Sequence, residues 1–225
     1  MDTRPGTITL WGDVTCPWAT LAAVRLHETR HRLGLDDDVA IDLRAFPLEL
    51  FNGRTTPRRV VDAEIAAVGP LAPGFGWQIW QGDLETYPGT VLLALEAVQA
   101  AKAQSLRASE QLDLGLRRAF FCESRNVGSR HDVLDVAASC DAVDVDALTE
   151  AIDTGRARRT VIDQWHEAER ADVQGSPHLF LTDGTNVHNP GITMHWEGEH
   201  PEGFRVIDAD GPSIYDDLLR KAADL

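Results

Sequence analysis

The chain has 225 residues, of which 43% are hydrophobic and 25% are charged, a composition typical of one large globular domain or of one domain carrying an insertion. Its formal net charge of −15 gives a surface that repels phosphate groups, so we expect neither nucleic acid nor an anionic membrane as a partner. No apolar run approaches the length of a membrane span. The polar start of the chain predicts no secretory signal.

The first part of the chain has a β-α-β pattern. Alternating apolar residues predict one strand over residues 7–11 and a second strand over residues 39–46. Between them, Pro17 stands at the start of a predicted helix and Gly34 at its end, which are the positions that proline and glycine favour.

The middle of the chain is mostly helical. Weak helical character over residues 57–68 is followed by a segment rich in glycine, proline and tryptophan over residues 69–89. From residue 90 to residue 172 the pattern predicts about four helices, with breaks near residues 126–129 and 141–146.

Strand character returns towards the C-terminus. Residues 178–181 and 186–188 predict two strands joined by a turn. A further strand is expected over residues 203–208, and a closing helix over residues 213–223. The segment from His195 to His200 is interpreted as an acidic surface loop, with a metal cluster as the alternative.

Three cysteines, Cys16, Cys122 and Cys140, are too few and too far apart for a disulfide framework or a structural zinc site. Free cysteines suit a reducing compartment, so we expect a cytoplasmic protein. Cys122 and Cys140 fall in helical segments and are interpreted as buried apolar side chains.

Cys16 stands where a strand ends and a helix begins. Unpaired N–H groups and the helix dipole at such a place lower the pKa of a thiol. The sequence therefore predicts that Cys16 is a thiolate nucleophile that is alkylated faster than Cys122 and Cys140. The alternative is a buried and inert cysteine.

Three segments resemble the DsbA-like thioredoxin-fold proteins, in particular the FrnE-like group. Asp13-Val14-Thr15-Cys16-Pro17-Trp18-Ala19 is similar to the family's D-x-x-C-P-W-C signature, and Gly175-Ser176-Pro177 is similar to its G-[TVS]-P stretch. The segment from Arg44 to Leu48 resembles the one after the family's second strand. The resemblance implies a cis Pro177 that faces Cys16.

The same resemblance implies an α/β, thioredoxin-like fold with an inserted helical domain. Residues 1–52 and 172–225 are expected to form the thioredoxin-like domain, and residues 53–171 the helical insertion.

The residues around Cys16 are the expected binding site for a thiol or disulfide. Pro17 and Trp18 follow the cysteine, and Trp18 either shields the sulfur or packs at the helix start. A cis Ser176-Pro177 bond would offer the backbone groups of Ser176 to a peptide or a small thiol.

Three further features near this site have two interpretations each. Asp13 either has a role at the site, in which it orients the turn or raises the pKa of the cysteine, or is an ordinary turn residue. His178 either titrates near neutral pH or is an outward-facing strand histidine. A loop containing Phe75, Trp77 and Trp80 either covers an apolar pocket or packs in the ordinary way.

One departure from the family signature bears on the mechanism, because Ala19 replaces the second cysteine. A dithiol enzyme uses that second cysteine to resolve a mixed disulfide. We therefore expect a thiol-dependent oxidoreductase with Cys16 as its sole nucleophile, no bound cofactor and a low-molecular-weight thiol as co-substrate. Its partners would be a small thiol or disulfide. The sequence leaves the oligomeric state open, with a homodimer as one option.

Two other functions remain open. One is a thiol-cofactor-dependent transferase or isomerase, since kappa-type glutathione transferases and chromene-carboxylate isomerases look similar in fold but carry serine at the first position. The other is a thioredoxin-fold binding protein without turnover.

A more remote alternative is a zinc hydrolase, because His27-Glu28-Thr29-Arg30-His31 is a literal H-E-x-x-H. Neighbouring arginines and the lack of a downstream third ligand weaken it, so no metal site is expected. Arg117 and Arg118 are interpreted as members of helix-surface ion pairs rather than as an anion site.

Overall fold

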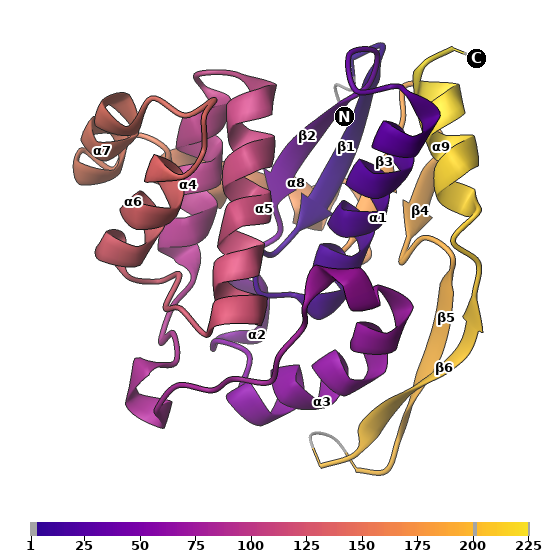
Figure 1. Ribbon diagram of the computed structural model, residues 1–225, viewed down its shortest axis with the longest axis horizontal. Coiled ribbons are helices and arrows are strands. Elements are labelled where there is room, and N and C mark those ends of the chain that lie inside the picture. The colour runs from indigo at the N-terminus through magenta and orange to yellow at the C-terminus, as the bar shows by residue number, and fades with distance from the viewer. Residues whose placement is uncertain (1–3, 200–201, 225) are drawn as a thin grey trace.

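The computed structural model describes residues 4–199 and 202–224. A four-stranded sheet of order β2-β1-β3-β4 stands at its centre (Figure 1). Strands β1 and β2 are parallel, whereas β3 runs antiparallel to β1 and β4 antiparallel to β3. The four strands are β1 (Thr7–Gly12), β2 (Ala40–Ala45), β3 (His178–Phe180) and β4 (Asn186–His188).

Helix α1 (Pro17–Leu33) connects β1 to β2 and presents Cys16 as its N-cap residue. Pro17 occupies the first helical position, where its missing N–H leaves no partner unsatisfied. Gly34 ends the helix with a left-handed φ of 68°, and its N–H bonds to the carbonyls of the last turn. Both ends of the predicted helix are therefore confirmed. Helix α9 (Ile214–Ala222) packs beside α1 (Figure 1).

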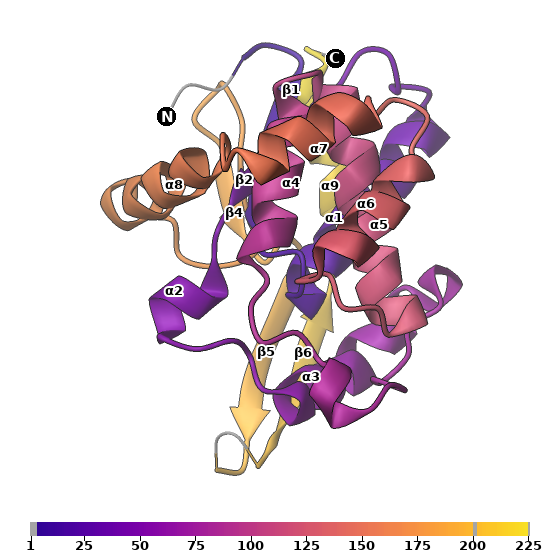
Figure 2. The ribbon, with the colours of Figure 1, turned by 90° about the vertical axis from the view of Figure 1, so that its left-hand side faces the viewer.

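The helices between β2 and β3 pack mainly on the β2 side of the sheet (Figures 1 and 2). Residues 90–172, all of which the structure describes, form five helices rather than about four, because Ser105 caps a separate α5 and Gly155, with a φ of 64°, separates α7 from α8. The elements are α2 (Leu48–Asn52), α3 (Arg58–Val68), α4 (Leu92–Lys102), α5 (Leu106–Glu123), α6 (Arg130–Ala138), α7 (Val145–Asp153) and α8 (Arg158–Arg170), with short 3₁₀ turns at Gly69–Leu71, Pro73–Phe75 and Leu84–Thr86.

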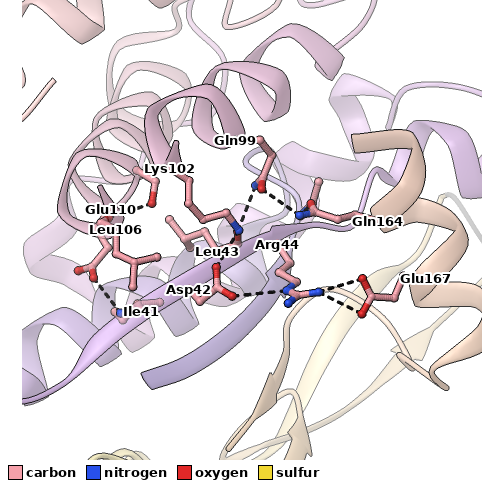
Figure 3. Close-up of polar contacts among 12 residues, drawn as sticks. Ile41, Asp42, Leu43, Arg44, Gln99, Lys102, Leu106, Glu110, Gln164 and Glu167 are labelled. Atoms are coloured by element: carbon pink, nitrogen blue, oxygen red, sulfur yellow. Dashed lines mark hydrogen bonds and ion pairs between the residues drawn. The ribbon is translucent and has the colours of Figure 1, made fainter. Parts of the chain in front are cut away.

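Side chains of α4, α5 and α8 cover the outer edge of β2, which pairs on its other side with β1 (Figure 3). An open strand edge invites pairing with another chain, and here polar side chains take the place of a neighbouring strand. The hydrogen bonds are Ile41 N–H to Glu110 Oε1 at 2.8 Å, Ala45 N–H to Gln164 Oε1 at 2.8 Å, and the Leu43 carbonyl with Gln99 Nε2 at 3.1 Å and Lys102 Nζ at 2.6 Å. These bonds attach the helices to the strand that leads away from the Cys16 helix.

A second, two-stranded sheet consists of β5 (Ile192–Glu197) and β6 (Phe204–Asp210), and it extends beside α3 (Figure 1). The predicted strand near residues 203–208 is therefore confirmed. The interpretation of the segment from His195 onward as a loop is wrong for residues 195–197, which belong to β5. His195 Nδ1 pairs with Asp208 at 2.9 Å, and His200 lies outside the described residues.

Residues of the sheet, of α1 and of the helices that follow β2 share one hydrophobic core cluster. Leu10, Leu112 and Leu219 are examples from β1, α5 and α9, and all three are buried. The division of the chain at residues 53 and 171 stays a prediction. Among the described residues, no helix is long and apolar enough to cross a membrane.

Candidate functional site

Two segments that are far apart in the sequence meet at Cys16. The Cys16 thiol donates a hydrogen bond to the carbonyl oxygen of Ser176 across 3.2 Å. The hydroxyl of Ser176 accepts a hydrogen bond from the backbone N–H of Asp13 at 2.9 Å. The Ser176-Pro177 peptide bond is cis. The expected cis proline and the expected meeting of its loop with the cysteine are therefore both confirmed.

Asp13 connects the turn before Cys16 to its surroundings. One carboxylate oxygen accepts from the N–H and the hydroxyl of Thr15, each at 2.8 Å, and the other accepts from the N–H of Leu48 at 3.0 Å. Burial raises the pKa of Asp13, against the lowering effect of these hydrogen bonds. Asp13 thus orients the turn and also fixes the start of α2, and its negative charge raises the pKa of Cys16.

Arg117 on α5 holds the same turn from the other side, although the sequence marked it as a surface residue. That interpretation is wrong, because its side chain is 1% exposed and forms a buried ion pair with Asp113, with Nε to Oδ2 at 2.6 Å. Its Nη1 donates to the Asp13 carbonyl at 3.0 Å and to Thr20 Oγ1 at 2.9 Å. Arg118, one residue on, is exposed and lies over the ring of Phe75.

Cys16 lines a pocket of about 370 Å³. Such a volume suits a small ligand rather than a protein surface. The pocket lies between the start of α1, the loop from α2 to α3, helix α3 itself, the cis-proline loop and β6. Its lining residues include Trp18, Leu48, Arg54, Pro57, Val60, Val61, Glu64, Ser176 and Arg205. Sequence reasoning missed Arg54, Glu64 and Arg205, because they come from three different elements and no local motif marks them.

Cys16 is buried, with only 5% of the residue exposed. Burial raises the pKa of the Cys16 thiol to about 11, and the negative charges of Glu64 and Asp13 add to that rise. Hydrogen bonding to the sulfur from the Ser176 side chain and from the backbone N–H of Ala19 lowers the pKa of Cys16 but does not overcome the effect of burial. The predicted lowering of the Cys16 pKa is therefore wrong. Burial disfavours the charged thiolate more strongly than the helix N-terminus favours it.

The expected order of alkylation changes accordingly. At pH 8 about a thousandth of Cys16 would be thiolate at a pKa near 11. Burial also raises the pKa of Cys122 and Cys140, but both are only partly buried. We expect iodoacetamide to label Cys16 last, with a rate that rises about tenfold per pH unit from pH 7 to 10. Peptide mass spectrometry measures the three rates, and fastest labelling of Cys16 near pH 7 would contradict the raised pKa.

Of the remaining predicted site residues, Pro17 and Trp18 line the pocket, whereas His178 does not. Trp18 is buried with an indole N–H that has no hydrogen-bond partner in the described part of the chain. His178 does not face outward as expected. It is 1% exposed, its Nδ1 accepts from the N–H of Gln174 at 3.1 Å, and burial lowers its pKa. His178 therefore supports the cis-proline loop from inside.

Phe75, Trp77 and Trp80 pack in an aromatic cluster with α5 and are not among the residues that line the Cys16 pocket. The alternative interpretation, in which this loop covers an apolar pocket, is therefore not supported at the Cys16 pocket. Cys122 donates to the carbonyl of Phe75 at 3.2 Å and does not line that pocket either.

The H-E-x-x-H segment does not assemble a zinc site. His27 Nδ1 lies 3.2 Å from the Arg30 guanidinium, whereas the exposed His31 pairs with Asp36 at 2.9 Å. Burial and the neighbouring Arg30 lower the pKa of His27 to about 4. Within residues 4–199 and 202–224, no group of three or more His, Cys, Asp or Glu side chains could hold a metal ion.

Solved structures similar to this chain share its fold, although no protein-family model and no curated protein matches the sequence. A probable DsbA oxidoreductase from Streptomyces coelicolor is 19% identical with a TM-score of 0.67, over 96% of this chain and 89% of that chain. The cytosolic disulfide reductase DsbM from Pseudomonas aeruginosa is 14% identical with a TM-score of 0.64, over 96% and 97%. DsbM solved with GSH gives a TM-score of 0.61 at 14% identity, over 97% and 100%.

A 2-hydroxychromene-2-carboxylate isomerase is 17% identical with a TM-score of 0.57, over 80% of this chain and 87% of that chain. At these identities the likeness establishes the fold. The chain has the α/β, thioredoxin-like fold of the DsbA-like proteins.

Proposed function

We propose that this protein is a thiol-disulfide oxidoreductase that works through Cys16 alone and uses a low-molecular-weight thiol to complete its cycle. The observation that carries the proposal is the position of the Cys16 sulfur, which lines a small pocket and contacts the Ser176 carbonyl beside a cis proline. Ala19 is fully buried at the place where a second thiol would stand. We also place the chain near the FrnE-like group on its Asp13-to-Trp18 signature.

The chemistry consists of two balanced exchanges. In the first, the Cys16 sulfur attacks one sulfur of a disulfide RSSR, so that a Cys16–SR bond forms, the S–S bond of the substrate breaks, and the thiol proton ends on the released RSH. In the second, an outside thiol R′SH attacks the mixed disulfide, Cys16 regains its proton and RSSR′ leaves. The Ser176 carbonyl holds the resting thiol proton until a disulfide enters.

Three observations support a small thiol rather than a protein as the reactant that resolves the adduct. The pocket volume of about 370 Å³ suits a small molecule. The buried Cys16 is not offered on a flat surface that a folded protein could reach. The similar reductase DsbM is described as cytosolic and was solved with GSH. A cytoplasmic location, with small thiols and disulfides as partners, belongs to the same proposal.

The test is adduct formation with bis(2-hydroxyethyl) disulfide, followed by intact-mass and peptide mass spectrometry. We expect one hydroxyethyl-thiol adduct on Cys16 of the wild type and none at that position in Cys16→Ser. Cys140→Ser is the matched control and should keep the Cys16 adduct. If no disulfide modifies Cys16 in the folded protein, the oxidoreductase proposal is wrong, and the non-catalytic binding protein takes its place.

A further inference from the structure

The pocket around Cys16 contains side chains of both charges. Glu64 on α3 and Arg205 on β6 form an ion pair, with Arg205 Nε to Glu64 Oε1 at 3.2 Å, and their side chains are 12% and 30% exposed. Arg54 lies exposed in the loop between α2 and α3 and lines the same pocket. The apolar part of the lining includes Pro57, Val60 and Val61, the last two about one helical turn before Glu64 on α3. One anion and two cations therefore stand around one nucleophilic sulfur.

We propose that this pocket selects small disulfides and thiols that carry an α-amino acid headgroup, with the ammonium group against Glu64 and the carboxylate against Arg205 and Arg54. The inference rests on the proposed function, because it names the substrate class of the same site.

A zwitterion fits this arrangement better than a ligand of a single charge. Within the described residues, Arg205 donates a hydrogen bond from Nε to Glu64, and its guanidinium lies over the ring of Trp196. A guanidinium offers five donors in a fork that matches a carboxylate. A carboxylate can therefore reach the outer nitrogens of Arg205 while an ammonium group takes its place beside Glu64. Each partly buried charge then keeps a partner, which avoids the cost of an unpaired charge in the pocket.

The overall charge of the protein favours the same class of ligand. A net charge of −15 repels a simple anion at long range, whereas a neutral zwitterion meets no such barrier. The apolar side chains of Pro57, Val60 and Val61 can contact the methylene groups next to the disulfide of the ligand. The indole N–H of Trp18, buried without a partner in the described residues, is a further donor in a residue that lines this pocket.

Binding of such a headgroup would also activate the cysteine. Glu64 from α3 and Asp13 from the β1–α1 turn are the negative charges that raise the pKa of Cys16, and Arg54 and Arg205 are the cations that line the pocket with it. Because an ammonium group against Glu64 offsets the larger of those two negative effects, Cys16 would lose its proton most easily when the correct disulfide is in place. The exchange itself is the balanced first step given above.

The experiment compares four disulfides: cystine, N,N′-diacetylcystine, which has no ammonium groups, cystine dimethyl ester, which has no carboxylates, and neutral bis(2-hydroxyethyl) disulfide. The rate of Cys16 adduct formation is measured by mass spectrometry at pH 7.5. Each rate is divided by the rate with a short unstructured peptide that contains cysteine, because leaving-group pKa values differ among the disulfides. We expect cystine to react about tenfold faster than either analogue that lacks the carboxylates or the ammonium groups, the effect of one charge-assisted hydrogen bond.

Two substitutions test which residues distinguish cystine from its analogues. Arg205→Gln should remove most of the preference for cystine over its dimethyl ester. Glu64→Gln should remove the preference for cystine over the diacetyl analogue, and it should also speed iodoacetamide labelling of Cys16 in the empty pocket. Arg59→Gln is the matched control, since Arg59 lies on α3, pairs with Glu202 at 3.4 Å and does not line the pocket. It should leave all preferences unchanged.

The outcomes separate the two proposals. Equal corrected rates for all four disulfides would overturn the zwitterion proposal and leave the oxidoreductase proposal standing. The same holds if the preferences persist in both Arg205→Gln and Glu64→Gln. Absence of any Cys16 adduct, even with the neutral disulfide, would instead refute the oxidoreductase function itself.

Discussion

Under the proposed single-cysteine mechanism, replacing Ala19 with cysteine is expected to remove the requirement for an outside thiol. Position 19 lies three residues after Cys16 on the same helix, so a thiol there can attack the mixed disulfide within the molecule. In the wild type the adduct on Cys16 should accumulate completely when no small thiol is added. In Ala19→Cys it should disappear, and an intramolecular disulfide should replace it, which intact mass and thiol counting measure directly.

Two control variants make this result specific. Ala23→Cys adds a buried thiol to the same helix, but position 23 lies roughly 10 Å along the helix axis from Cys16, so this variant should leave the adduct in place. Cys122→Ser should also change nothing, because Cys122 does not line the pocket. If the wild type turns over without added thiol and Cys122→Ser abolishes that turnover, Cys122 is the resolving residue and the monothiol mechanism is wrong.

Replacing Arg117 with methionine is expected to destabilise the protein by about 3–5 kcal/mol, because it leaves the buried Asp113 carboxylate without its partner. The substitution also removes the hydrogen bond from Arg117 to the Asp13 carbonyl, which holds the turn before Cys16. Urea unfolding measures the change in the free energy of unfolding.

Two variants accompany this measurement. The double replacement Arg117→Met with Asp113→Leu should recover most of the lost stability, since no buried charge is then left alone. The exposed neighbour Arg118 is the matched control, and Arg118→Met should cost only about 0.5 kcal/mol. A loss below about 1 kcal/mol in Arg117→Met would show that the ion pair contributes little.

Local patterns were sufficient for the elements that carry the cysteine. Alternating apolar residues predicted β1 and β2, while Pro17 and Gly34 marked the ends of α1, because helix ends depend on the conformational preferences of single residues. The resemblance on Cys16 and Pro177 correctly brought together two segments whose polar atoms are bonded in the structure. Strand β5 was missed because Gly191 and Gly198 flank it and the acidic residues that begin at Glu197 resemble those of a surface loop.

The properties of the site depended on contacts that no local pattern contains. The sequence placed Cys16 at a helix start and therefore predicted a low pKa, but packing buries the sulfur and brings Glu64 into its pocket, and both effects raise the pKa instead. Arg117 looks like its neighbour Arg118 in the sequence, yet only Arg117 is enclosed by the core. The sequence alone thus determined that Cys16 stands at the start of the first helix and that no second thiol stands at position 19. Only the tertiary structure decided which charges surround that cysteine, because burial and long-range pairing are set by the whole chain.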